Sequence, residues 1–204
     1  MSSATPAGTP TAAAPDAGAQ AASAARRRLV DAAGPLFYRD GVATGVDALC
    51  RAAGVSKRTM YQLFASKDEV IAAGLDQWAD TIRAQIWPPD GDGAGPRERV
   101  LAVFAALEAA SADPDFRGCP FVAAAVEVKD PDHPAAVVAR RHKQALVDFF
   151  ATEARRAGAA DPDGLAAALT VVYDGSSARA VLLAQPLDGL AVITATTLLD
   201  AAGL

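Results

Sequence analysis

The chain has 204 residues, a net charge of −5 and a hydrophobic fraction of 51%, much of it alanine. This length suits one large domain or two small ones, and alanine favours helices over strands. No apolar run reaches the roughly 18 residues of a membrane span, and the N-terminus lacks the charged start and apolar block of a secretory signal. We therefore expect an all-α cytoplasmic protein with no membrane partner.

The charge is distributed unevenly along the chain. Residues 1–75 carry eight Lys/Arg and six Asp/Glu, whereas residues 76–204 carry eleven and eighteen. The negative total therefore does not exclude nucleic-acid binding, provided that the acidic part faces away from the phosphates. Two cysteines, Cys50 and Cys119, are too few for a disulfide scaffold, so we expect both to be reduced.

The N-terminal part predicts a tail followed by a helix. Residues 1–22 are mostly Ala, Pro, Gly, Ser and Thr, a composition that predicts a disordered tail. We expect order from near Ala24, because five apolar residues between positions 29 and 37 have helical spacing. Pro35 lies inside this helix and predicts a kink or a local loosening. Gly41 is a suitable helix end.

Two short helices are predicted next, joined by a tight turn. Thr44 is placed to cap the first helix and Ser56 the second, and the turn between them contains Gly54. Met60 and Phe64 form the inner face of the second helix. This is the helix-turn-helix pattern, in which the second helix enters the major groove of DNA.

The outer face of the second short helix is polar. Arg and Lys side chains can bond guanine, and Gln can bond adenine, although Gln62 could instead face a phosphate or water. Tyr61, Lys67 and Thr44 suit phosphate contacts. The alternative for the charged residues is an ordinary solvated face. The predicted DNA-binding residues are Thr44, Ser56, Lys57, Arg58, Thr59, Tyr61, Gln62 and Lys67.

The rest of the chain predicts further helices separated by Pro- and Gly-rich turns. Ser66 to Glu69 is a capping box that opens a fourth helix, ending near Trp87. Further helices are expected from near 97 to 112, from 120, from about 134 to 157, from 162 to 183 and from 187 to 201. The total is about nine helices and no strand. We expect a tail over 1–22, a helix-turn-helix domain over 23–75 and a helical body over 76–204.

Several sequence strings resemble the signature of the TetR family of regulators. They are LFYRDG at 36–41, ATGVDAL at 43–49, VSKRTMYQLF at 55–64 and SKD at 66–68. The close resemblance covers about residues 26–75. RGCPF at 117–121 and DPDHP at 130–134 look like stretches found in one group of these regulators.

The resemblance implies a three-helix DNA-binding head, a fourth linking helix, and a body that binds a small molecule and dimerises through its last two long helices. It also implies that the ligand releases the operator, as in a repressor. We expect no cofactor. Small residues along 162–183 and 187–201 suit close helix packing in a homodimer, with intrachain packing as the alternative. Two symmetric heads would read a palindromic operator.

Aromatic and aliphatic residues of the body predict either an ordinary core or the lining of an effector pocket. The effector expected from such a lining is small and largely apolar. The predicted pocket residues are Trp78, Phe104, Leu107, Phe121, Val122, Leu146, Phe149 and Tyr173.

Other functions rest on the cysteines and histidines. Cys119 precedes a helix that starts at a proline, where the helix dipole would lower the thiol pKa and permit thiol sensing; the alternative is a half-buried structural side chain, and packing is expected for Cys50. His133 is expected in a turn and His142 on a solvated helix face, with no metal cluster around either. An enzyme using Cys119 as nucleophile lacks an orienting third group. A helical interaction module that no longer binds DNA is a further alternative.

Overall fold

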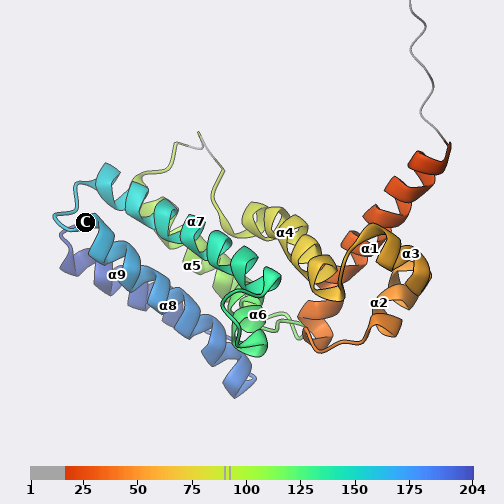
Figure 1. Cartoon of the computed structure of the whole chain (residues 1–204). Helices are drawn as coiled ribbons and strands as arrows, with labels where there is room; N and C mark the ends of the chain where they lie inside the picture. Colours follow the sequence, from red (N-terminus) through yellow and green to blue (C-terminus); the bar gives the residue numbers. More distant parts are fainter. Residues whose placement is uncertain (1–16, 90, 92) are drawn as a thin grey trace, which may run out of the picture.

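The computed structural model describes residues 17–89, 91 and 93–204. Over these residues the chain forms nine α-helices and no strand, which confirms the predicted all-α class (Figure 1). Within them, no helix is both long and apolar enough to cross a membrane. The helices are α1 (Ala17–Asp40), α2 (Val46–Ala53), α3 (Lys57–Leu63), α4 (Lys67–Ile86), α5 (Pro96–Ser111), α6 (Pro120–Val128), α7 (Pro134–Ala157), α8 (Pro162–Leu183) and α9 (Leu190–Ala201).

The helices build an elongated molecule (Figure 1), with one buried apolar cluster at each end and a smaller one between them. The head consists of α1, α2, α3 and the first turns of α4, and the body consists of α5 to α9. Leu29, Leu49 and Met60 are fully buried in the head core. In the body core the rings of Phe104 and Phe150 stack with centroids 5.6 Å apart. α4 packs on both α1 and α7 and therefore connects the two ends.

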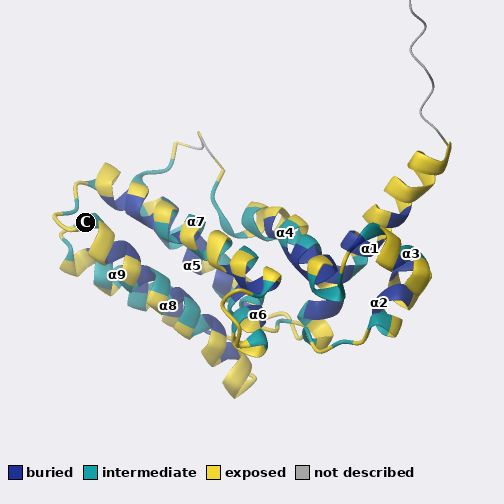
Figure 2. Cartoon of the chain, in the orientation of Figure 1, coloured by how far each residue is buried: buried dark blue, intermediate teal, exposed yellow. Residues whose placement is uncertain are grey.

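α1 begins earlier than the sequence predicts. Its first residue is Ala17, so residues 17–22 are helical rather than part of a disordered tail, and residues 1–16 of the predicted tail lie outside the described residues. Residues 17–24 are exposed (Figure 2). Packing therefore does not hold these turns. Alanine, the strongest helix former, extends the helix from the packed part that starts at Ala25.

α1 also continues through Pro35 as one helix, which corrects the expected loosening, whereas the alternative of a kink stays a prediction. Pro35 has no N–H to donate to the Asp31 carbonyl one turn earlier. Both residues are exposed, so water can solvate that carbonyl. The preceding Gly34 is buried against α4. A Cβ on Gly34 would lie 3.1 Å from the Gly74 carbonyl oxygen, and a Cβ on Gly74 would overlap the Cβ of Ala33. The two glycines therefore allow α1 and α4 to approach closely.

Two further boundaries differ from the prediction. Gly45, not Thr44, is the N-cap of α2, and the Thr44 hydroxyl instead donates to the Gly41 carbonyl at 2.8 Å. Gly41 ends α1 in the left-handed region with φ +82°, as predicted. α9 begins at Leu190 rather than near Leu187, because Leu187 turns into the body core before the helix starts.

Candidate functional site

The α2–α3 unit has the geometry expected of a helix-turn-helix. Gly54 ends α2 with φ +61°, a left-handed conformation that glycine adopts without strain. Ser56 then caps α3, and its hydroxyl oxygen accepts from the Thr59 backbone N–H at 3.0 Å. Below α3, Met60 is fully buried and its sulfur lies 3.9 Å from Cys50 Sγ. Cys50 is thus a packing residue, as predicted.

The outer face of α3 carries a patch of solvent-exposed side chains. Arg58, Tyr61 and Gln62 are exposed, and 54% of the Tyr61 surface is accessible to solvent. Lys57 is exposed too, but it forms an ion pair of 2.7 Å with Asp47 of α2. An exposed cation, phenol and amide on one short helix match the chemistry that reads base edges and phosphates.

Two residues predicted to contact DNA also make internal contacts, and their role at DNA stays a prediction. The Thr59 hydroxyl lies 2.8 Å from the Ser56 hydroxyl at the start of α3. The Lys67 ammonium donates to the backbone carbonyls of Val42 at 2.9 Å and Thr44 at 3.2 Å. Lys67 therefore holds the loop between α1 and α2 in place. Its position just inside the start of α4 did not indicate this role in the sequence.

The body contacts the head at the same loop. The Glu127 carboxylate of α6 accepts from the backbone N–H groups of Val42 and Ala43, each at 2.9 Å. His133 caps α7 and its Nε2 lies 3.4 Å from the Asp68 carboxylate at the start of α4. The sequence analysis missed Glu127, because nothing in its local pattern identifies a contact across 85 residues.

A cavity of about 490 Å³ lies between α1, α4 and the body helices. Of the predicted pocket residues, those that line it are Trp78, Leu107, Phe121, Leu146 and Tyr173. Phe104, Phe149 and Val122 do not line it. Phe104 is fully buried within the body core, and Phe149 stacks on Trp87 with centroids 5.1 Å apart. Periodicity correctly predicted that Phe104 and Phe149 point inward, but it could not distinguish filled core from cavity wall. Val122 is only half-buried.

Polar residues that the sequence analysis missed also line the cavity. Tyr38 of α1 donates to the Gly118 carbonyl at 3.1 Å and accepts from the Arg117 N–H at 2.7 Å. Burial raises the pKa of the Tyr38 phenol, so this group stays protonated. Ser177 lines the cavity one helical turn after Tyr173, a spacing that could have identified it from the sequence.

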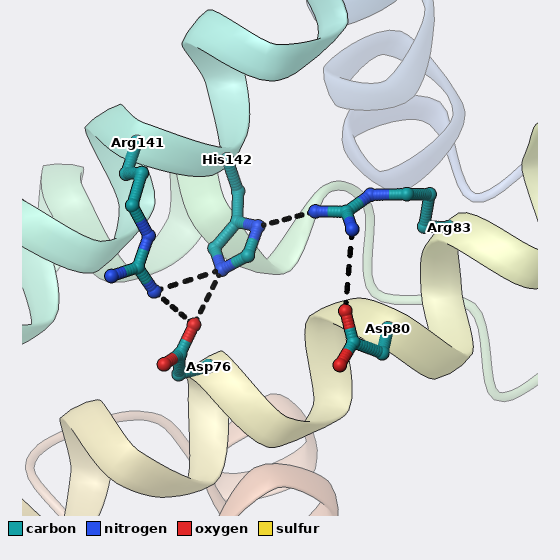
Figure 3. A network of polar contacts seen from close by, with 5 residues as sticks. All are labelled: Asp76, Asp80, Arg83, Arg141 and His142. Atoms are coloured by element: carbon teal, nitrogen blue, oxygen red, sulfur yellow. Dashed lines mark hydrogen bonds and ion pairs between the residues drawn. The ribbon is translucent and has the colours of Figure 1, made fainter.

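A polar network joins α4 to α7 beside the cavity (Figure 3). An arginine guanidinium only donates, so His142 Nδ1 accepts from Arg83 at 3.2 Å and Nε2–H donates to Asp76 at 2.8 Å. Arg141 also pairs with Asp76. Burial acts to raise the pKa of Asp76, but the hydrogen bonds from His142 and Arg141 outweigh it, and the net shift is downward.

His142 is therefore not on a solvated face, which corrects the expectation. Its side chain is 9% exposed, and its ring stacks on Phe121 with centroids 5.0 Å apart. The reason is that α4 and α6 both pack on α7 at this turn and cover the imidazole. Within the described part of the chain, no group of three or more His, Cys, Asp or Glu side chains could hold a metal ion.

Cys119 lines the cavity at the N-cap of α6. Burial raises the pKa of its thiol, and the nearby Lys143 ammonium only partly opposes this effect. The backbone N–H groups of Phe121 and Val122 at the start of α6 lower the thiol pKa, as expected, but burial outweighs them and the net shift is upward. A thiol that stays protonated is a poor nucleophile, which disfavours both thiol sensing and covalent catalysis at this residue.

The comparisons with known proteins agree with this geometry. The family model "Bacterial regulatory proteins, tetR family" matches residues 29–73. A TetR transcriptional regulator from Streptomyces avermitilis is 54% identical, with 88% of this chain and 98% of that chain covered and a TM-score of 0.85. A TetR-family regulator from Streptomyces coelicolor is 29% identical, with coverage of 89% and 97% and a TM-score of 0.78.

Escherichia coli NemR in its reduced form shares the fold, with a TM-score of 0.72 at 18% identity over 85% of this chain and 95% of that chain. No curated protein matches the chain. The 54% identity to a regulator that the chain covers almost completely, together with the matched head, shows the family. The protein belongs to the TetR family of transcriptional regulators, which bind DNA through the N-terminal helix-turn-helix and are not enzymes.

Proposed function

We propose that the protein is a dimeric repressor that binds a palindromic operator and leaves it when a small molecule enters the body cavity. The exposed polar face of α3 is the observation that best supports DNA binding. Arg58 and Gln62 are exposed there, above a head core in which Met60 and Leu49 are fully buried. A rigid scaffold below an exposed polar face is what direct reading of base edges requires.

Exposed apolar residues on α8 and α9 support the dimer. Val171, Leu182 and Ile193 keep 71%, 82% and 64% of their surface exposed. Between the first two, Gly175 and Ala178 are exposed at helical spacing, so the four residues form one stripe of α8. Apolar and small residues on adjacent helices suit a self-complementary four-helix interface around a two-fold axis. The two heads would then read two half-sites of a palindrome.

The position of the cavity supports ligand control. Its wall includes Tyr38 from α1 and Trp78 from α4, whose rings pack edge to face with centroids 4.8 Å apart. Tyr38 is bonded to the loop at Gly118, which precedes α6. A ligand that displaces this loop or these rings therefore acts directly on α1 and α4, the helices that carry the head. α4 also contributes to both ends of the molecule, and a domain boundary near residue 75 stays a prediction.

Replacing Arg58 with Ala tests the DNA-binding face. The assay is fluorescence anisotropy on the DNA upstream of the protein's own gene, at several salt concentrations. Loss of one base-reading arginine is expected to cost about 1–3 kcal/mol, or about 5- to 150-fold in affinity. Arg155→Ala, at the far end of α7, is the matched control and should bind as the wild type does.

Equal affinity of the Arg58→Ala variant and the wild type at moderate salt, with the dimer intact, would contradict the assigned face. Failure of the wild type to bind any upstream DNA would favour the helical interaction module.

A further inference from the structure

Ser177 carries a buried hydroxyl with no hydrogen-bond partner. The residue is 1% exposed, and its Oγ is the buried side-chain polar atom without a partner in the described part of the chain. A helical serine usually bonds back to the carbonyl four residues earlier, yet Ser177 does not. Native structures contain few such groups, and each one calls for an explanation, such as a ligand that completes the hydrogen bond.

Ser177 forms part of the cavity wall. Ser177 lines the cavity on the same face of α8 as Tyr173. Opposite lies Gly118, where a Cβ would sit 3.4 Å from Ser177 Oγ and 3.2 Å from Val181 Cγ2. Gly118 therefore packs closely on α8 beside the hydroxyl, and a side chain at this position would crowd Val181 and Ser177. Tyr38 does not compete as a donor, because its hydroxyl already donates to the Gly118 carbonyl.

The charges around the cavity are already neutralised. Its wall contains four basic Lys or Arg side chains, each within ion-pair distance of a carboxylate; the pairs are Arg39–Asp40, Arg83–Asp80, Arg117–Asp115 and Lys143–Asp174. The Asp113 carboxylate lines the cavity as well. An anionic ligand would have to break one of these pairs to gain a counter-ion, and a desolvated charge without one is unfavourable. The lining therefore favours a neutral ligand.

The remaining wall suits flat rings. Trp78, Trp87, Phe116 and Phe121 line the cavity together with Tyr173. Aromatic walls favour stacked or edge-to-face contacts with a ring-bearing ligand. A volume of about 490 Å³ lies within the range of small-molecule pockets.

We propose that this cavity binds a neutral ligand of two or three rings that carries a hydrogen-bond acceptor such as a ketone, and that the Ser177 hydroxyl donates to this acceptor. The inference rests on the proposed function, since it names the chemical class of the effector. It explains the unpartnered hydroxyl.

Three probes with one two-ring skeleton test this inference. Benzophenone supplies a ketone, diphenylmethane lacks it, and diphenylacetate carries a negative charge. Both tryptophans of the chain, Trp78 and Trp87, line the cavity, so quenching of tryptophan emission reports binding, with calorimetry as a second readout. The wild type is expected to bind the two neutral probes saturably and not to bind diphenylacetate over the same concentrations.

The decisive comparison is between Ser177→Ala and the wild type. Loss of one hydrogen bond should weaken benzophenone binding about 5- to 10-fold and change diphenylmethane binding less than about 2-fold, because only the ketone uses the hydroxyl. The unliganded Ser177→Ala protein should melt no lower than the wild type, since the variant removes an unpartnered buried hydroxyl. Ser176→Ala, on the same turn but outside the cavity wall, is the matched control for both readouts.

Several results would overturn the inference. They are equal weakening of both neutral probes in Ser177→Ala, tightest binding of diphenylacetate, and no binding of benzophenone to the wild type. Binding of the wild type to its upstream DNA is measured in parallel without probe. If DNA binding is present and the probe results fail, only this inference is wrong, whereas absent DNA binding contradicts the proposed function itself.

Discussion

The contact between α1 and α4 offers a sharp test of how the head is held. Gly74 is buried on α4, and a Cβ placed there would overlap Ala33 Cβ and lie 2.9 Å from the Gly34 backbone nitrogen. A backbone atom cannot rotate away as a flexible side chain can. Gly74→Ala should therefore incur an overpacking cost of about 3 kcal/mol, the upper part of the usual range, offset by about 1 kcal/mol of helix propensity.

The net loss of unfolding free energy for Gly74→Ala is then about 2 kcal/mol. For a protein of this size it corresponds to a melting temperature lower by about 4–8 °C. The assay is urea denaturation followed by circular dichroism, with thermal melting as a check. Gly34→Ala is a milder comparison, because its Cβ would lie 3.0 Å from Trp78 Cβ and 3.1 Å from the Gly74 carbonyl oxygen, both longer than the contacts of a Cβ on Gly74.

A second substitution tests the cause of this loss. Ala33→Gly alone should cost about 2 kcal/mol, from helix propensity and one buried methyl. If the Ala33 methyl is the main obstacle, the Ala33→Gly/Gly74→Ala double variant should be no less stable than Ala33→Gly alone. Independent effects would instead sum to about 4 kcal/mol. An additive result, or a Gly74→Ala protein as stable as the wild type, would refute the close-approach explanation.

Two further predictions concern the head loop and the dimer. Lys67→Met should lower the unfolding free energy of the DNA-free protein by about 1–2 kcal/mol, because two loop carbonyls lose a charged donor. Unchanged stability with reduced DNA affinity would instead show that Lys67 acts only as a phosphate contact. Leu182→Glu should convert the dimer to a folded monomer in analytical ultracentrifugation, because it places a charge in the proposed apolar interface. Val126→Glu, which changes an exposed valine on α6, should stay dimeric, and a dimeric Leu182→Glu protein would contradict the proposed interface.

The sequence determined the helices and the family, because both are written in local patterns. Apolar spacing predicted the inward faces of the helices, and the cap at Ser56 and the turn at Gly54 placed the recognition helix within a residue. These features depend on neighbours within a few positions along the chain, which is why one sequence suffices to predict them.

The tertiary structure decided which inward residues leave a cavity and which polar groups meet across it. Leu146 lines the cavity, whereas Phe149, on the next turn of α7, does not line it and stacks on Trp87 instead. Lys67 bonds a loop about 25 residues away, and Ser177 is left unpartnered only because the body closes around it. Such outcomes depend on the packing of helices far apart in the chain, and local periodicity carries no information about that packing.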